Sequence, residues 1–220
     1  MIKTIIFDIG NVLADFSWEP FFRSFGFQEE VFEKLTRATV KSPEWNELDR
    51  GEWSTEKIIA SFIANDPSIK AEITQVFQDV NAMVTKRDYA IPWILHLKEA
   101  GYRVLYLSNL GEITHAHCQD ALSFIPYTDG GILSYEVKVI KPQPAIYQAL
   151  IDKYDLKPEE CVFVDDMKEN VEAAAQMGFH VVHAVSHKAA LEGLLALGVP
   201  PYETKCEKAI DILLEDNLHD

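Results

Sequence analysis

The sequence predicts an α/β fold, built on a doubly wound, mostly parallel sheet with a helical block inserted after its first strand. Short apolar runs, typical of strands buried on both faces, alternate with segments whose apolar residues recur at helical spacing. Three of these runs end in reactive polar residues. In an open parallel sheet the carboxyl ends of the strands lie along one edge, so these residues are expected to meet in one crevice. The arrangement is Rossmann-like.

The first strand is the apolar run Ile5-Ile6-Phe7, which leads directly into Asp8. Gly10 follows, and its conformational freedom is expected to permit a sharp exit from the strand. Ligands of open α/β sheets bind outside the carboxyl ends of the strands, so an acid at the end of the first strand is positioned to react with one. On this stretch alone, an Asp that merely caps a turn explains the pattern equally well.

Residues 16–86 contain only helical spacing, interrupted by Gly, Pro and Asp. Helices are expected over 19–25, 29–40, 55–64 and 69–84, with Ser54 as an N-cap. A purely helical block at this place predicts a separate cap. The alternative, helices packed on the sheet, fits less well because no strand signal interrupts the block. The expected division is a core of residues 1–15 and 87–200, a cap of residues 16–86 and a tail of residues 201–220.

The second half of the chain alternates strands and helices. Strands are expected over 104–107, 161–164 and 180–183, and helices over 89–100, 112–122, 145–154, 168–178 and 189–197. Gly130-Gly131 indicates a turn before the short apolar pair Ile132-Leu133. The strand at 104–107 ends in Ser108-Asn109, and the strand at 161–164 ends in Asp165-Asp166. Lys141 precedes Pro142 in the loop before a helix. A further short helix is expected at 210–214 in the charged tail.

Composition excludes several classes of function. No apolar run approaches the length of about 18 residues that a membrane span needs, and no signal-peptide pattern opens the chain, so we expect a cytoplasmic protein without membrane contact. The formal net charge of -15 argues against a nucleic-acid partner. The cysteines Cys118, Cys161 and Cys206 lack metal-site spacing and are expected to be unpaired thiols. We expect a monomer or a homodimer.

Four fragments, in order and at predicted strand ends, resemble the haloacid dehalogenase (HAD) superfamily. They are Phe7-Asp8-Ile9-Gly10-Asn11-Val12, Leu107-Ser108-Asn109, Lys141-Pro142 with Pro144 and Ile146-Tyr147, and Val164-Asp165-Asp166 followed by Asn170-Val171. Each fragment is weak alone, but the set is specific and extends to about residue 197. The helical block after the first strand is similar to the small helical cap of this family.

The resemblance implies a phosphatase in which Asp8 is the nucleophile and forms an aspartyl phosphate. It implies Mg²⁺ bound by Asp8, Asp166 and the backbone carbonyl of Gly10, with Asp165 as a ligand through water or as an orienting group. Lys141 would contact both Asp8 and the phosphate. The Ser108 hydroxyl and the Asn109 amide would donate hydrogen bonds to the phosphate oxygens. The substrate would be a small phosphorylated metabolite.

The chain departs from the family pattern at Gly10, where phosphatases of the family usually carry a second aspartate as general acid and base. A subgroup of bacterial sugar-phosphate phosphatases, including one that acts on α-glucose 1-phosphate, resembles this chain in its Asp-x-Gly-Asn-Val opening. Its later aspartate matches Asp15. Asp15 is therefore a candidate substitute acid, although capping the first turn of the cap explains it as well.

Two other functions are compatible with the absence of an aspartate at position 10. Haloacid dehalogenases lack it because halide leaves unprotonated, but they use no metal, whereas Asp165-Asp166 is best explained by one. A non-catalytic module that binds a phosphorylated ligand or a protein would not need Asp8 as an attacking carboxylate. For the phosphatase, the cap is expected to set substrate choice, and the candidates to face the crevice are Trp18, Phe21, Phe22, Trp45, Asp49 and Arg50. Arg50 would suit an anion, but a charge at a helix end explains it better.

Overall fold

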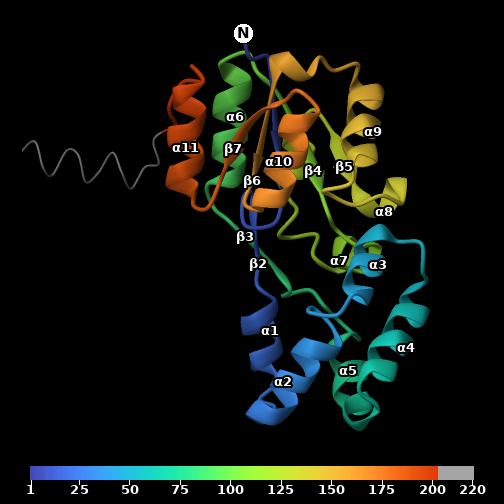
Figure 1. Cartoon of the computed structure of the whole chain (residues 1–220). Helices are drawn as coiled ribbons and strands as arrows, with labels where there is room; N and C mark the ends of the chain where they lie inside the picture. Colours follow the sequence, from blue (N-terminus) through green and yellow to red (C-terminus); the bar gives the residue numbers. More distant parts are fainter. Residues whose placement is uncertain (203–220) are drawn as a thin grey trace, which may run out of the picture.

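The structure, a computed structural model, describes residues 1–202 and is centred on a five-stranded parallel sheet (Figure 1). The strand order is β5-β4-β1-β6-β7. Its strands are β1 (Thr4–Phe7), β4 (Arg103–Ser108), β5 (Gly131–Leu133), β6 (Cys161–Asp165) and β7 (His180–His183). The predicted α/β fold with a mostly parallel sheet is confirmed, and β1 lies at its centre.

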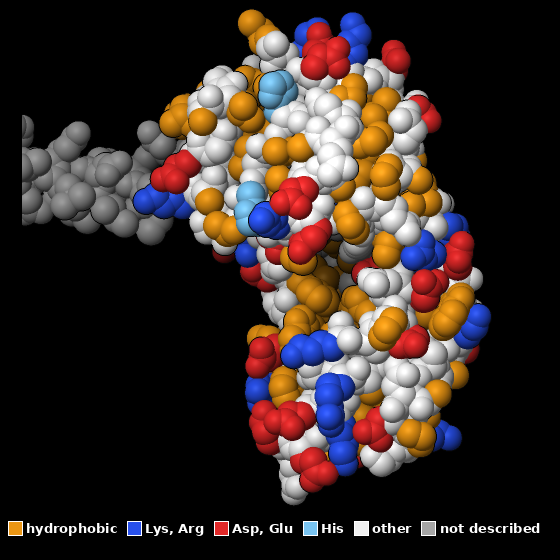
Figure 2. Space-filling view, viewed as in Figure 1, with side chains coloured by type: hydrophobic (Ala, Val, Ile, Leu, Met, Phe, Trp, Pro, Cys, Tyr) orange, Lys and Arg blue, Asp and Glu red, His pale blue; other side chains and the backbone are white. Residues whose placement is uncertain are grey.

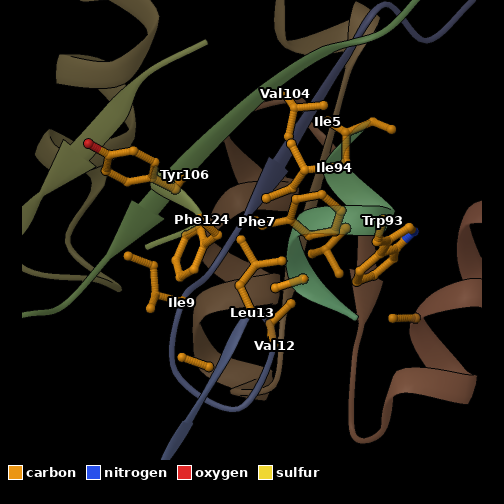
Figure 3. Packing of buried hydrophobic residues seen from close by; sticks show 14 of the residues in the cluster. Ile5, Phe7, Ile9, Val12, Leu13, Trp93, Ile94, Val104, Tyr106 and Phe124 are labelled. Atoms are coloured by element: carbon orange, nitrogen blue, oxygen red, sulfur yellow. The ribbon is translucent and has the colours of Figure 1, made fainter. Parts of the chain in front are cut away.

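Helices cover both faces of this sheet. One face packs on α6 (Ala90–Glu99) and α11 (His187–Ala196), and the other packs on α9 (Pro144–Tyr154) and α10 (Lys168–Gln176). Successive residues of β1 alternate between the faces because side chains of a strand have a period of two. Phe7 packs against Trp93 of α6 (Figure 3). Their ring centroids are 4.6 Å apart, whereas Ile6 belongs to the cluster on the other face.

Five helices form a second lobe, which we call the helical lobe, below the sheet in Figure 1. They are α1 (Trp18–Ser24), α2 (Glu29–Ala38), α3 (Glu44–Arg50), α4 (Thr55–Asn65) and α5 (Lys70–Val76). Their apolar faces enclose a hydrophobic cluster that includes Phe22, Leu35, Phe62 and Ile73, each fully buried. The lobe thus has a core separate from the clusters on the two faces of the sheet.

The segment between β1 and α6 is not purely helical, which corrects the sequence-based expectation. β2 (Ala14–Phe16) and β3 (Val84–Lys86) pair antiparallel and form a short two-stranded ribbon at the junction of the lobes. The helix expected over 69–84 ends at Val76. In the following loop Asp79 accepts a hydrogen bond from the backbone of Asn81, and such local bonds compete with helix formation. Strands of three residues are too short for their periodicity to be recognised.

Short elements complete the chain and differ in places from expectation. They are α7 (Glu112–His117), α8 (Ser134–Val137), η1 (Pro67–Ile69), η2 (Ile125–Tyr127) and η3 (Pro158–Glu160). The helix expected over 112–122 therefore ends at His117, and β5, α3 and α8 were not expected. Cys118 and Cys161 are buried free thiols. Cys206, the short helix expected at 210–214 and all of the expected tail beyond residue 202 lie outside the described residues. Within residues 1–202, no helix has the length and apolarity to cross a membrane.

Candidate active site

The carboxyl ends of three strands meet at a cavity of about 280 Å³ between the sheet and the helical lobe. Figure 2 shows a hollow with hydrophobic side chains where the two lobes join. Asp8 follows β1, Ser108 ends β4, and Asp166 follows β6. The predicted site residues that line the cavity are Asp8, Gly10, Ser108, Asn109, Lys141 and Asp166. Three strand ends therefore lie together as predicted, and the loop that carries Lys141 joins them as a fourth segment.

Lys141 connects two buried carboxylates. Its Nζ atom lies 2.8 Å from Asp8 Oδ1 and 2.6 Å from Asp165 Oδ2. The side chains of Lys141, Asp8 and Asp165 are exposed by only 1%, 9% and 0%. Burial alone would lower the pKa of Lys141, but the Asp165 and Asp8 carboxylates outweigh it and raise that pKa. The lysine is therefore a fixed positive charge at neutral pH.

Asp8 is held by its surroundings through Oδ1, which accepts hydrogen bonds from the Ile9 backbone at 2.6 Å and contacts Lys141. Burial raises the pKa of Asp8, and Lys141 only partly offsets this effect. Asp165 and Asp166 raise it further. A positive charge in addition to Lys141 would favour the carboxylate form that a nucleophile needs.

Asp165 is buried completely and its oxygens are occupied by neighbours. Oδ1 accepts hydrogen bonds from the Met167 backbone at 2.8 Å and from Asn170 Nδ2 at 3.0 Å, while Oδ2 contacts Lys141. Asn170 thus helps to orient the carboxylate that in turn holds Lys141. Asp165 does not line the cavity itself.

Asp166 faces the cavity and is held by Asn11, whose Nδ2 donates a hydrogen bond to Asp166 Oδ2 at 2.9 Å. Asn11 has a φ of 56°, a left-handed conformation that Asn adopts more readily than most residues. Gly10 was expected to provide this freedom, but its φ is not positive, and a Cβ there would meet only the Cβ of Phe16 at 4.0 Å. The turn after β1 therefore depends on Asn11 rather than on Gly10.

Three carboxylates form a cluster suited to a divalent cation. Ligand oxygens of Asp8, Asp165 and Asp166 all lie within 4.8 Å of one another. An all-oxygen donor set with carboxylates is the chemistry that Mg²⁺ prefers. Burial raises the pKa of Asp166, as it does that of Asp8, so both carboxylates would gain from a nearby cation. The three carboxylates therefore fit the Mg²⁺ ion that the family resemblance implies.

Asn109 acts on Lys141 in a way that sequence reasoning did not foresee. Its Oδ1 accepts a hydrogen bond from the Lys141 backbone N–H at 2.7 Å, and its Nδ2 donates one to the Lys141 carbonyl at 3.0 Å. These two bonds attach the loop that carries Lys141 to the end of β4. No local pattern signals them, because the two residues are 32 positions apart.

The structure does not bring Asp15 to the other predicted site residues. Asp15 lies in β2, outside the set that lines the cavity, and its Oδ1 accepts a hydrogen bond from Arg87 Nε at 2.8 Å. The same guanidinium donates to the Asn11 carbonyl at 2.8 Å. Asp15 neither caps α1, whose N-cap is Ser17, nor lines the cavity. Through Arg87 it connects the β2–β3 ribbon to the turn after β1.

The helical lobe contributes fewer cavity residues than expected. Trp45 and Asp49 line the cavity, whereas Phe21 and Phe22 are buried inside the lobe. Trp18 lies away from the cavity beside Phe32, and Arg50 bonds to Glu47 and Gln143. Burial raises the pKa of Asp49 to about 7, opposed by Lys141 and assisted by Asp8.

Comparison with known proteins identifies the family. Residues 2–178 match the model of the haloacid dehalogenase-like hydrolases, so the chain belongs to that family. It is 27% identical to D-ribitol-5-phosphate phosphatase of Bacteroides thetaiotaomicron, over 81% of this chain and 90% of that protein. It is 31% identical to (S)-2-haloacid dehalogenase 1 of Pseudomonas sp., over 39% of this chain and 38% of that protein.

Other matches are partial or concern the fold alone. The chain is 24% identical to mouse acyl-CoA dehydrogenase family member 10 over 90% of its own length, but it spans only 20% of that protein. A HAD family enzyme of Bacteroides thetaiotaomicron, solved in complex with magnesium and inorganic phosphate, shares the fold with a TM-score of 0.64. The two sequences are 23% identical, and the match covers 82% of this chain and 93% of that one.

Proposed function

We propose that this protein is a Mg²⁺-dependent phosphatase of a small phosphorylated metabolite, with sugar phosphates as the first candidates. The observation that carries the proposal is the buried group in which Lys141 contacts Asp8 and Asp165, with Asp166 beside them at the cavity. A carboxylate next to a fixed positive charge and a cation site is suited to attack phosphorus and to tolerate the charge of a phosphoryl group.

Asp8 is the proposed nucleophile. Its Oδ1 is engaged by Lys141 and the Ile9 amide, which fixes the orientation of the carboxyl group. Attack of an Asp8 oxygen on phosphorus, in line with the leaving oxygen, forms an aspartyl phosphate, and water then cleaves the new bond between phosphorus and Asp8. Lys141 stabilises the negative charge on the phosphoryl oxygens during both displacements.

Mg²⁺ would be held by Asp8, Asp166 and the backbone carbonyl of Gly10. Asp165 orients Lys141 and would not bind the cation directly, because its oxygens already accept bonds from Met167, Asn170 and Lys141. When bound, the cation offsets the repulsion between the carboxylates and the phosphate.

The phosphate is bound at the end of β4 by the Ser108 hydroxyl and the Asn109 backbone amide, together with Lys141. Ser108 is buried and lines the cavity. The helical lobe is the proposed cap, and its Trp45 lies with Phe16 over the rest of the cavity, with ring centroids 5.9 Å apart. Aromatic faces of this kind suit the carbon face of a sugar, while the cavity volume limits the substrate to a small molecule.

Dehalogenation is a second candidate, because a haloacid dehalogenase is among the relatives and Gly10 provides no acid. The pair of Asp166 and its supporting Asn11 argues against it, since a halide-releasing reaction needs no cation site. A binding module without turnover is disfavoured by the buried Asp8–Lys141 pair, which costs desolvation that mere binding does not require.

The test is a product assay with matched controls. Purified protein is given a panel of sugar 1-, 5- and 6-phosphates and (S)-2-haloacids, with Mg²⁺ or with a chelator, and phosphate and halide are measured. The proposal predicts phosphate release that requires both Mg²⁺ and Asp8, with none from Asp8→Asn. Halide release that persists in chelator would identify a dehalogenase. No release from any compound by folded protein would favour the binding module.

A further inference from the structure

We propose that Asp49, on the helical lobe, is the general acid and base of the reaction and supplies the group that Gly10 lacks. The inference rests on the proposed phosphatase function. It assigns to Asp49 two proton transfers: one to the leaving oxygen of the substrate and one from the water that cleaves the aspartyl phosphate.

The chemistry requires such a group. An alkyl phosphate releases an alkoxide unless an acid protonates the leaving oxygen, and general acid catalysis typically contributes a factor of about 10²–10⁴. Among residues 1–202, the carboxylates that line the cavity are Asp8, Asp49 and Asp166. Asp8 is the nucleophile and Asp166 a cation ligand in the proposed function. Asp49 is the cavity carboxylate that remains.

Asp49 is held at the cavity by contacts between the lobes. Its backbone carbonyl accepts a hydrogen bond from Ser134 Oγ at 2.5 Å. At the C-terminal end of α3, Arg50 Nη1 donates to Gln143 Oε1 at 3.1 Å and Lys138 Nζ donates to the Gly51 carbonyl at 2.6 Å. These bonds fix the C-terminal end of α3 on the core, and with it the position of Asp49 relative to Asp8.

Gly111 lets this end of α3 lie close to the core. Its backbone N–H also acts on the Asp49 carboxyl group, where it opposes the rise of the pKa. A Cβ on Gly111 would lie 2.8 Å from the Leu48 carbonyl oxygen, so only glycine permits this approach. The contact explains why α3 can present a carboxylate to a site built by the sheet.

The environment of Asp49 suits proton transfer near neutral pH. Burial raises the pKa of Asp49 to about 7, and a catalytic acid and base is most effective when its pKa is near the working pH. The charged groups that face it from the core are Asp8, which raises the pKa, and Lys141, which lowers it. On its own helix the nearest charges, Glu47 and Arg50, pair with each other.

Bonds and protons are balanced over the two displacements at phosphorus. In the first, an Asp8 oxygen bonds to phosphorus, the bond from phosphorus to the ester oxygen breaks, and that oxygen takes the proton of the Asp49 carboxylic acid. In the second, the Asp49 carboxylate removes a proton from water, the water oxygen bonds to phosphorus, and the bond to Asp8 breaks. Phosphate and alcohol leave, and Asp49 is protonated again.

The experiment compares Asp49→Asn with wild type on two substrates in the presence of Mg²⁺. One is an alkyl phosphate chosen from the compounds that wild type hydrolyses, and the other is p-nitrophenyl phosphate, whose leaving phenolate needs little protonation. Asn keeps the shape of Asp but cannot transfer the proton. With the alkyl ester kcat/KM is expected to fall about 10²–10⁴-fold, and with p-nitrophenyl phosphate less than about tenfold. A burst of p-nitrophenol equal to the enzyme concentration is also expected, because the water step has lost its base.

Asp15→Asn is the matched control and is expected to retain wild-type kcat/KM on both substrates. A second variant, Gly10→Asp in the Asp49→Asn background, is expected to recover at least about tenfold with the alkyl ester, since a Cβ at Gly10 meets only Phe16 at 4.0 Å. Equal losses of kcat/KM on the two substrates, or wild-type activity in Asp49→Asn, would overturn the role of Asp49. If wild type itself released no phosphate, or Asp8→Asn remained active, the proposed function would fail instead.

Discussion

The ammonium group of Lys141 lies 2.6 Å from Asp165 Oδ2, and both side chains are almost completely buried. A buried ion pair is tolerated only when each partner compensates the other, and here the same lysine also compensates Asp8. The ion pair of Lys141 and Asp165 therefore stabilises the fold and also holds the positive charge of Lys141 next to Asp8.

Replacing Lys141 with Met leaves two buried carboxylates without their counter-charge. We expect the free energy of unfolding to fall by about 3–5 kcal/mol, the usual cost of breaking a buried pair, and phosphate release to be lost. Urea unfolding and a phosphate assay measure the two effects. Lys168→Met is the control, because its pair with Glu172 is exposed and should contribute less than about 1 kcal/mol. Similar losses in the two variants would contradict the buried-pair account.

Asp15→Asn tests whether the ribbon carboxylate takes part in chemistry. Asp15 is 43% exposed and pairs with Arg87, so the change should cost at most about 1 kcal/mol of stability and change kcat less than about twofold. Thermal unfolding and steady-state kinetics provide both values. A hundredfold loss of kcat would restore Asp15 as the substitute acid.

Asn11→Gly removes the amide that holds Asp166 and keeps a residue that accepts a φ of 56°. Loss of a group that orients a metal ligand typically weakens metal binding about 10–100-fold. The Mg²⁺ concentration for half-maximal phosphate release should rise by that factor, with kcat at saturating Mg²⁺ less affected. An unchanged Mg²⁺ requirement would show that Asp166 needs no support from Asn11.

Asp49→Asn should also change stability in a pH-dependent way when the protein is kept free of metal with a chelator. The folded pKa of Asp49, about 7, lies above its ordinary value of 3.8, so the folded state binds more protons between these pH values. The contribution of this residue to stability is therefore lost as pH rises from about 4 to 7. The free energy of unfolding of the variant, measured relative to wild type by urea unfolding, should therefore increase by about 1–3 kcal/mol from pH 4 to pH 8. A constant difference across this range would contradict the raised pKa.

Site residues that lie at the end of a strand could be predicted from the sequence. Asp8, Ser108 and Asp166 follow buried apolar runs, and parallel pairing then brings them to one edge. The β2–β3 ribbon was missed because two strands of three residues carry no measurable period.

Contacts between distant segments were beyond a single sequence. The bonds from Asn109 to the Lys141 backbone and from Arg87 to Asp15 join residues 32 and 72 positions apart, and neither follows from local spacing. Asp49 was expected to face the crevice, but its relation to Gly111 depends on how α3 docks on the core. That docking is a tertiary property.

The most direct test of the central claim is to look for phosphate on Asp8 itself. Wild type is mixed with its best phosphate ester and Mg²⁺, quenched in acid within the first turnover, and digested for mass spectrometry. We predict a phosphoryl group on the peptide that contains Asp8, absent when Mg²⁺ is chelated and absent in Asp8→Asn. Steady release of phosphate while Asp8 stays unmodified, with wild-type turnover in Asp8→Asn, would contradict the account.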